Sequence, residues 1–470
     1  MPIDRQIPAN FSIPEDWPEE FQASKGELPG GIPAEREPAG LATGHGAELN
    51  WLFVDLNSYF ASVEQEVRPE LRGRPVGVVP MMADTTVCIA ASYEAKAFGV
   101  KTGTVVADAK RMCPEIVLVE GRHELYTEYH HRVVEAVESC LPVAAILSID
   151  EMACRLMGRE RPLLAALELG RKVKARIRER VGNALRSSVG LATNRYLAKV
   201  ASDMEKPDGL VALPLDVLPG ALRQLELRDL PGIGAQTEKR LHQQGIHTMD
   251  ELLALSCEQA GEVWGSVWGE RLWHWLRGED FEMSETDHLK SISHQHVLAP
   301  EMRTEEKAWA VAHKLLHKAA MRLRAANLWA SNIGLAIGFA APRGDGGPAP
   351  VSRFGVPARG WHDGLKLSEC QDNATLIAAL RRLWESRPRG AQFEHPYFIG
   401  VVLGELVPAR LHTLNLFEGL EDEQSRARLL ETMDALNHKY GLSTLAPATM
   451  LTAFRAAPTR IAFHSVPDVF

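Results

Sequence analysis

Between residues 50 and 205, short apolar runs alternate with stretches whose apolar residues recur every three or four positions. Apolar runs of four to eight residues indicate strands, and a spacing of three or four indicates amphipathic helices. This alternation predicts an α/β or α+β domain. The expected strands are 51–55, 76–80, 86–91, 116–119, 144–149, 152–157 and 187–191, and the expected helices are 58–67, 105–112, 122–141, 162–181 and 194–204.

The pattern changes in the second half of the chain. Residues 206–285 predict short helices interrupted by Gly and Pro, and residues 290–405 predict a return to strands and helices. In this last region KSISHQHVL alternates as a strand does, and apolar residues recur at helical spacing through 303–326. The stretch APRGDGGPAP (341–350) predicts an exposed loop.

The two ends of the chain lack this folded pattern. Residues 1–48 are rich in Pro, Gly and Glu without periodicity, which predicts a disordered or loosely attached extension. Residues 406–470 predict a tail with one helix at 422–438.

The composition is that of a globular protein with several domains. The chain has 470 residues, more than one hydrophobic core accommodates, with 45% apolar and 24% charged residues. Its six cysteines are scattered without a CxxC pair, which favours a reducing cytoplasm and argues against zinc and disulfides. We expect neither a signal peptide nor a membrane span, because no apolar run is long enough for either.

The charge distribution says more than the net charge of −9. Residues 1–50 contain nine acidic and three basic residues, whereas residues 290–400 contain fifteen basic and nine acidic ones. The acidic N-terminal region therefore masks a basic module in the second half of the chain. Such a module suits nucleic-acid binding, although a basic domain is often only a solvated surface.

Two apolar strands are followed by carboxylates. Asp55 ends the run WLFVD, and Asp150-Glu151 follows the run AAILSI. Taken singly, Asp55 fits a turn or a helix N-cap, and Asp150-Glu151 fits a hairpin turn between two strands. Taken together, they could meet at one edge of a sheet. Three crowded carboxylates repel one another unless a cation compensates, and divalent ions with oxygen ligands do so. The leading hypothesis is therefore two-metal nucleotidyl transfer.

Five ordered motifs resemble those of the Y-family, or translesion, DNA polymerases. DLNSYFASVE (55–64) and SIDE (148–151) are similar to the two metal motifs of that family, and SYEAKAFGV (92–100) to its fingers motif. GLATNRYLAKVASDMEKPDGL (190–210) is similar to the segment after the second metal motif, and LPGIG (230–234) to the thumb hairpin. The resemblance is colinear over about 50–400, with a core like that of bacterial DNA polymerase IV.

The resemblance implies a role for each matching residue. Asp55, Asp150 and Glu151 would be the catalytic, metal-binding carboxylates, with the carbonyl oxygen of Leu56 as a further ligand. The implied cofactor is a pair of Mg²⁺ ions, with Mn²⁺ as a substitute. Phe60 would be the steric gate that excludes a ribose 2′-hydroxyl. The implied nucleotide-binding residues are Phe60, Tyr59, Tyr93, Lys96 and Lys199.

The implied partners are primer–template DNA, deoxynucleoside triphosphates and a sliding clamp. A Gly turn before a helix offers amides to a DNA phosphate, and a basic stripe on helix 303–326 suits a duplex backbone. The residues expected to contact DNA are Gly232, Gly234, Lys314, Lys318 and Arg322. TLNLFEGLE (413–421) is similar to a clamp-docking motif, with Leu414, Leu416 and Phe417 as its anchors; an alternative is a strand of the last subdomain. Residues 428–445 resemble the C-terminal extension of polymerase V-type subunits.

The fold class that follows is α+β, a right-hand polymerase with a ferredoxin-like palm, small fingers, a helical thumb containing a helix-hairpin-helix, and an α/β little finger. We expect low-fidelity synthesis past damaged bases, no membrane association and a cytoplasmic enzyme. Two alternatives are a non-catalytic polymerase-like accessory protein and a nucleotide cyclase on a similar palm. The expected boundaries are 1–49 for the extension, 50–64 and 120–205 for the palm, 65–119 for the fingers, 206–287 for the thumb, 290–405 for the little finger and 406–470 for the tail.

Overall fold

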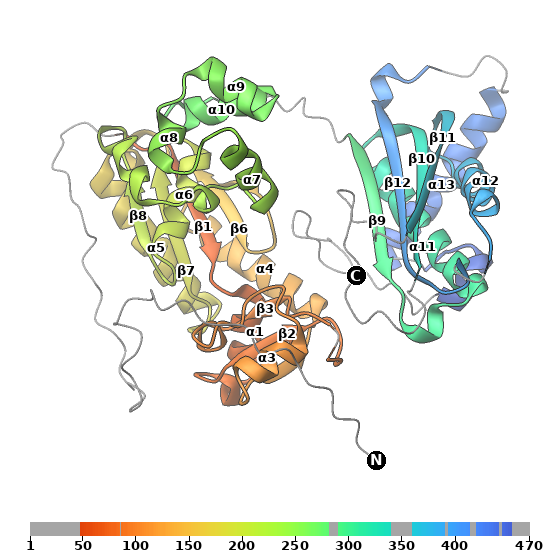
Figure 1. Cartoon of the computed structure of the whole chain (residues 1–470), viewed down its shortest axis with the longest axis horizontal. Helices are drawn as coiled ribbons and strands as arrows, with labels where there is room; N and C mark the ends of the chain where they lie inside the picture. The colour runs from red at the N-terminus through yellow and green to blue at the C-terminus, as the bar shows by residue number, and fades with distance from the viewer. Residues whose placement is uncertain are drawn as a thin grey trace. The chain divides into compact units, whose positions relative to one another are not determined.

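The computed structural model of the chain describes residues 48–84, 86–281, 290–339, 360–390, 393–413, 420–440 and 444–453 (Figure 1). The described residues of 48–281 form the first part of the chain, and those of 290–453 form the second part. The predicted exposed loop at 341–350 lies outside the described residues.

A five-stranded sheet forms the centre of the first part. Its order is β5-β6-β1-β7-β8, and the central strand β1 pairs antiparallel with both of its neighbours. β1 is buried along its whole length because both faces of the sheet are covered. The bounds are Trp51–Leu56 for β1, Val143–Ile146 for β5, Glu151–Arg155 for β6, Ser187–Ala192 for β7 and Leu210–Leu213 for β8.

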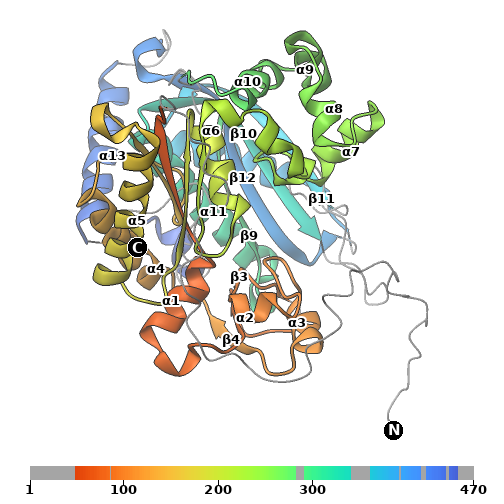
Figure 2. The same ribbon diagram turned by 90° about the vertical axis from the view of Figure 1, so that its left-hand side faces the viewer.

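Successive side chains of β1 point to opposite faces of the sheet, so they contribute to two different cores. Leu52, Val54 and Leu56 pack with residues of α4 (His123–Glu138) and α5 (Leu163–Arg180). Trp51 and Phe53 point to the opposite face and pack with α6 (Arg195–Met204) and the helices that follow it. Figure 2 shows α5 and α6 on opposite sides of the strands. Asp55, two residues after Phe53, therefore belongs to the α6 face.

Close packing of α6 on the sheet depends on a glycine in β7. A Cβ at Gly190 would lie 2.0 Å from the carbonyl oxygen of Ala198 and 2.4 Å from the amide nitrogen of Ser202. Only glycine therefore allows the helix backbone to approach the strand so closely. This contact fixes the distance between α6 and the carboxylate end of β1.

A smaller three-stranded sheet, of order β3-β2-β4, has its own core of small side chains. The expected strand at 86–91 is only two residues long in the structure, and one short helix, α2, was not predicted. The elements here are α1 (Tyr59–Val67), β2 (Val76–Val79), β3 (Ala90–Ala91), α2 (Tyr93–Lys96), α3 (Val106–Met112) and β4 (Val117–Glu120).

The region 206–285 is not wholly helical, and the prediction is wrong at one element. The apolar stretch LVAL forms β8, which pairs parallel with β7 and completes the five-stranded sheet. A four-residue apolar run is too short to show a period, so only its pairing with β7 decides its conformation. The remaining long elements are the helices α7 (Ala235–Gln243), α8 (Met249–Leu253), α9 (Cys257–Trp264) and α10 (Val267–Leu276).

The second part contains an antiparallel four-stranded sheet of order β11-β10-β12-β9. Helices α11 and α12 pack on one face and share its core (Figure 1). The predicted strand at KSISHQHVL and the predicted helix at 303–326 are both present. The bounds are Ser291–Val297 for β9, Glu305–Ala325 for α11, Leu328–Phe339 for β10, Gly360–Cys370 for β11, Asn373–Ser386 for α12 and Pro396–Pro408 for β12.

The C-terminal segment packs against α11. Arg324 of α11 makes two hydrogen bonds to Asp434 in α13 (Leu420–Tyr440), at 2.6 and 2.9 Å. His313 pairs with the Thr449 hydroxyl at 2.7 Å, and Ala453 is fully buried in the core of the second part. The expected helix at 422–438 is confirmed, and this segment is more than a tail, because it covers a helix of the domain.

Short 3₁₀ helices connect these elements. They are Pro69–Leu71, Gly158–Glu160, Leu215–Val217, Gly220–Gln224, Leu227–Asp229, Pro300–Met302, Ala409–Leu411 and Ala448–Ala453. Among the helices that the structure describes, none combines the length and the apolar character needed to cross a lipid bilayer.

Candidate active site

The three predicted carboxylates meet at one end of the central sheet. Asp55 lies directly opposite Glu151 in the β1–β6 ladder, so both side chains are on the same face of the sheet. The amide of Leu56 donates a 2.9 Å hydrogen bond to the carbonyl oxygen of Asp150. Two segments almost one hundred residues apart in the sequence thus converge.

The expectation that Asp150 ends a strand is wrong in detail. β5 ends at Ile146, and the following residues turn into β6, which starts at Glu151 and runs antiparallel to β5. The Leu147 amide closes this turn on the carbonyl oxygen of Glu151 at 2.9 Å. The predicted hairpin turn is therefore present, and it places Asp150 and Glu151 beside Asp55.

Lys199 neutralises the carboxylates. α6 begins after Asn194, whose side chain caps the helix by accepting from the Leu197 amide. One turn later Lys199 donates from Nζ to Asp55 at 2.5 Å, and its ammonium lies 2.8 Å from Glu151 Oε1. These carboxylates hold the pKa of Lys199 above its usual value despite burial, which lowers it. Lys199, which was predicted to bind the triphosphate, thus bridges Asp55 and Glu151 in this structure.

A second lysine at the site was not predicted. Nζ of Lys206 lies 2.8 Å from Asp55 Oδ1 and 2.7 Å from Asp203 Oδ1. Burial lowers and Asp55 raises the pKa of Lys206, with a net increase. Lys206 stands in the quoted motif, at MEKPDG, but after the helix has ended, so helical spacing could not link it to Lys199.

Asp150 differs from its neighbours in having no ion pair to a described residue. Its carboxylate accepts a 2.5 Å hydrogen bond from the Ser148 hydroxyl. The pKa of Asp150 is raised to about 6. Burial is the largest cause and the negative charges of Asp55 and Glu151 add to it, whereas the hydrogen bond from Ser148 acts in the opposite direction. Among the three carboxylates, Asp150 is therefore the one whose negative charge is not balanced by a cation among the described residues.

The two aromatics at the start of α1 have different surroundings. Tyr59 is buried and donates a 2.6 Å hydrogen bond to the carbonyl oxygen of Tyr126, and burial raises its pKa well above the usual value. Tyr59 is thus a packing residue, and its predicted contact with nucleotide is not supported by its position. Phe60 is half-buried, with its ring stacked on Tyr126 at 4.4 Å between centroids.

Tyr93 and Lys96 share the short helix α2. Nζ of Lys96 lies 4.4 Å from the centre of the Tyr93 ring, a cation–π contact. Burial lowers the pKa of Lys96, and the positive charge of Lys206 lowers it further, while Asp55 raises it. Lys96, Lys206 and Asp55 are therefore close enough to influence one another electrostatically. The contact of Lys96 with a nucleotide stays a prediction.

Beneath this site a buried ion pair ties α1 to α4. The Glu64 carboxylate is fully buried, and Arg122 contacts both of its oxygens, at 3.0 and 2.5 Å. The Tyr126 hydroxyl donates to the same carboxylate at 2.8 Å. Because Tyr126 also supports the Phe60 ring, this network positions the predicted steric gate.

Replacing Arg122 by methionine is expected to destabilise the protein by about 3 kcal/mol, because it leaves the buried Glu64 carboxylate without its main cation. Thermal or urea unfolding followed by circular dichroism measures the loss. Arg111→Met is the matched control: its pair with Asp108 is exposed, so its loss should cost under about 0.5 kcal/mol. Equal effects of the two variants would contradict this assignment.

The predicted DNA-binding residues fall into two groups. Gly232 has a φ of +91° and Gly234 is the N-cap residue of α7, so the predicted turn before a helix is present. The predicted exposed stripe on α11 is wrong at Lys314, which is only 5% exposed because the C-terminal segment covers it. Its Nζ donates to the carbonyl oxygen of Ala453 at 3.4 Å.

Lys318 is half-buried and Arg322 is exposed, so these two residues remain candidates for DNA contact. Both lie close enough to His294 of β9 for their charges to lower its pKa, together with burial, to about 4. The predicted clamp anchors, Leu414, Leu416 and Phe417, lie outside the described residues.

The donor chemistry of the site suits a hard cation. Within the described part of the chain, no three His, Cys, Asp or Glu side chains are already arranged around a common metal position. The Lys199 and Lys206 ammonium groups instead occupy the positions around Asp55 and Glu151. Carboxylate oxygens from Asp55, Asp150 and Glu151 are the ligands that Mg²⁺ and Mn²⁺ prefer, so the residues fit such ions once the lysines move.

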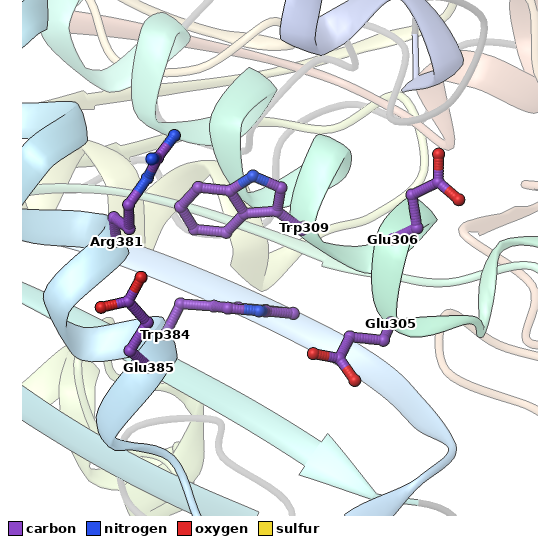
Figure 3. A pocket seen from close by; sticks show the side chains of 6 residues that line it. All are labelled: Glu305, Glu306, Trp309, Arg381, Trp384 and Glu385. Carbon is purple, nitrogen blue, oxygen red and sulfur yellow. The ribbon is translucent and has the colours of Figure 1, made fainter.

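A pocket of about 430 Å³ lies elsewhere, between the start of α11 and the end of α12 (Figure 3). The rings of Trp309 and Trp384 lie 5.3 Å apart there. Arg387 lies 4.4 Å over the Trp384 ring and pairs with Glu305. These contacts join α11 to α12, and the pocket contains none of the predicted site residues. Its lining is Glu305, Glu306, Trp309, Arg381, Trp384 and Glu385.

Comparison with known proteins agrees with this geometry. Residues 54–203 match the impB/mucB/samB family, residues 228–280 match the thumb domain of DNA polymerase iota, and residues 289–416 match the impB/mucB/samB family C-terminal domain. DNA polymerase IV of Moorella thermoacetica is 34% identical over 413 residues, which are 86% of this chain and 97% of that protein. DNA polymerase IV of Pelotomaculum thermopropionicum is 36% identical over 252 residues, 53% of this chain and 62% of that protein.

Solved structures share the fold. A chimeric Y-family DNA polymerase has a TM-score of 0.61 and 23% identity, covering 76% of this chain and 99% of that one. The arrangement of the three carboxylates and two lysines and the near-complete coverage of a DNA polymerase IV both point to the same family. The chain belongs to the Y-family of DNA polymerases, has its right-hand α+β architecture, and is a DNA-directed DNA polymerase of the translesion class.

Proposed function

We propose that the enzyme extends primers by two-metal-ion nucleotidyl transfer, with Asp55, Asp150 and Glu151 holding the ions. The observation that carries this proposal is the convergence of the three carboxylates at one sheet end, with the Asp150 carboxylate outside any ion pair among the described residues. Mg²⁺, with Mn²⁺ as a substitute, would neutralise the developing charge on the phosphates.

The chain's own residues then have separable tasks. Asp55 and Glu151 are buried or half-buried on the α6 face, so their oxygens stay fixed while a nucleotide enters. Lys96 and Lys206 would offer ammonium groups to a triphosphate, and the Lys96 ammonium makes a cation–π contact with the Tyr93 ring. Phe60, on the first turn of α1, would lie against the sugar of the incoming deoxynucleotide.

The separate sheets support the proposed division into subdomains. Residues 50–64 and 120–205 form the palm, 65–119 the fingers, 206–287 the thumb and 290–405 the little finger, except that β8 adds the strand Leu210–Leu213 to the palm sheet. Residues 420–440 and 444–453 would extend the little finger, because Asp434, Thr449 and Ala453 all contact α11. The segment 413–421 would dock on a sliding clamp, and an open site would permit low-fidelity copying of damaged templates.

Primer extension with purified chain, Mg²⁺ and the four deoxynucleotides tests the proposal. Elongation on undamaged and abasic templates supports translesion synthesis with the proposed site. Absence of product in Mg²⁺ and in Mn²⁺ would favour an accessory role, and release of a cyclic nucleotide would favour a cyclase.

Replacing Lys206 by methionine is expected to raise the KM for the incoming nucleotide about tenfold, because the variant removes one ammonium group from the triphosphate site. The value of kcat should change less, since the metal-binding carboxylates remain. Steady-state single-nucleotide insertion measures both constants. Lys239→Met, on helix α7, removes the same charge away from the carboxylates and should leave the KM within about twofold. A KM unchanged in Lys206→Met would contradict the role of this lysine.

A further inference from the structure

Four side chains at the site form a closed arrangement of alternating charge. Asp55 contacts Lys199 through Oδ2 at 2.5 Å and Lys206 through Oδ1 at 2.8 Å. Asp203 contacts the same two lysines through Oδ1, at 3.1 and 2.7 Å. Lys206 therefore contacts one predicted metal ligand, Asp55, and Lys199 contacts two, Asp55 and Glu151. Asp203 is the partner of both lysines that is not a predicted metal ligand.

Helix α6 fixes this arrangement. Asp203 follows Lys199 by four residues and precedes Lys206 by three, so α6 and its C-terminal end place the carboxylate between the two ammonium groups. Gly190 holds α6 close against the sheet that carries Asp55. Asp203 is 30% exposed, compared with 7% for Asp55, so it has room to follow the lysines.

The lysines and a divalent cation compete for the same oxygens. An ammonium group within 3 Å of Asp55 must give up that contact before a metal ion can bind there, since like charges repel strongly at such distances. A lysine that loses Asp55 without another anion nearby would remain close to the ion at a high electrostatic cost, or would leave the site. Asp203 supplies an anion at hydrogen-bond distance from both.

We infer that Asp203 is a positioning residue, which retains Lys199 and Lys206 while Asp55 exchanges their ammonium groups for a divalent cation. The inference rests on the proposed two-metal site and adds a residue that neither binds the ions nor touches the reacting atoms. The retained lysines stay within reach of the triphosphate. Asp203 thereby couples metal binding to nucleotide binding.

Asp203→Asn keeps the size of the side chain and removes its charge. Lys206 then depends on Asp55, and Lys199 depends on Asp55 and Glu151, so both ammonium groups compete more strongly with a metal ion. We expect the affinity of the full-length chain for Mn²⁺, in the absence of DNA and nucleotide, to fall about tenfold. The electron paramagnetic resonance signal of free Mn²⁺ measures this affinity. The Mg²⁺ concentration for half-maximal extension should rise by a similar factor, and kcat at saturating Mg²⁺ should stay within about threefold.

A double-mutant cycle separates this role from a general effect of charge. If Asp203 acts by holding Lys206, the logarithmic loss in Mn²⁺ affinity caused by Asp203→Asn should be at most half as large in the Lys206→Met background as in the wild type. If Asp203 acts only through its electrostatic field, the loss is the same in both backgrounds and the cycle is additive. Glu205→Gln is the matched control: this exposed neighbour loses the same charge and should leave Mn²⁺ affinity within about twofold.

The outcomes also distinguish this inference from the proposed function. Mn²⁺ binding that is lost in Asp55→Asn but unchanged in Asp203→Asn would overturn the role of Asp203 and leave the metal site intact. An additive cycle would overturn it as well. Mn²⁺ affinity and extension that do not depend on Asp55 would overturn the proposed metal site, and the inference with it. A thermal melt of each variant shows that it is folded.

Discussion

Asp150→Asn is expected to lower the rate of primer extension by about 10³-fold or more while leaving DNA affinity within about twofold. Asparagine keeps the shape of the side chain and can still accept the hydrogen bond from Ser148. It cannot supply the negative charge that a divalent ion requires. Single-turnover extension measures the loss, and fluorescence anisotropy of labelled primer–template measures DNA binding.

The same substitution is expected to stabilise the metal-free protein. The folded-state pKa of Asp150 is about 6, above the value near 4 of an unfolded chain, so folding favours the protonated form. Its contribution to stability is fully present below pH 4 and is lost as the pH rises through 6. Asparagine has no such loss, so the variant should gain about 1–2 kcal/mol at pH 7, shrinking to near zero at pH 4.

Thermal melts in the presence of a chelator, at pH 4.5 and pH 7.5, measure this difference. Asp216→Asn is the control, because Asp216 is exposed and away from the carboxylates. A variant that extends primers normally would remove Asp150 from the active site. An inactive Asp150→Asn variant whose stability equals that of the wild type at both pH values would instead contradict the electrostatic account of the site.

Phe60→Ala is expected to raise the efficiency of ribonucleotide insertion relative to deoxynucleotide insertion by about 10²-fold. The ring of Phe60 is held against Tyr126, whose hydroxyl is in turn held by Glu64, so it cannot move aside easily for a 2′-hydroxyl. Removing the ring removes the clash without adding a contact to deoxyribose. The measurement is kcat/KM for a matched ribonucleotide and deoxynucleotide pair.

The control for Phe60 is Phe98→Ala, which removes an aromatic ring that is 54% exposed after α2. This variant should keep the sugar selectivity of the wild type. Unchanged selectivity in Phe60→Ala would mean that another residue excludes the 2′-hydroxyl. A comparable loss of selectivity in both variants would point to a general loosening of the site.

Local patterns in the sequence determined most of the secondary structure and the identity of the carboxylates. Strand alternation alone places Asp55 on the same face as Phe53, and the spacing of α6 alone places Lys199 beside Asp203. These features depend on residues within one turn or one strand of each other. The family motifs belong to the same class of information, because each is a short contiguous stretch.

Tertiary structure decided what depends on contacts between distant segments. The pairing of Asp55 with Glu151 needs β6 to lie against β1, and β8 exists as a strand only because β7 offers it a free edge. Lys206 joins the site although its helix has already ended, and Lys314 loses its predicted exposure because Ala453 lies over it. Periodicity describes which face of one element is apolar, whereas the segment that covers or meets that face is set by packing elsewhere in the chain.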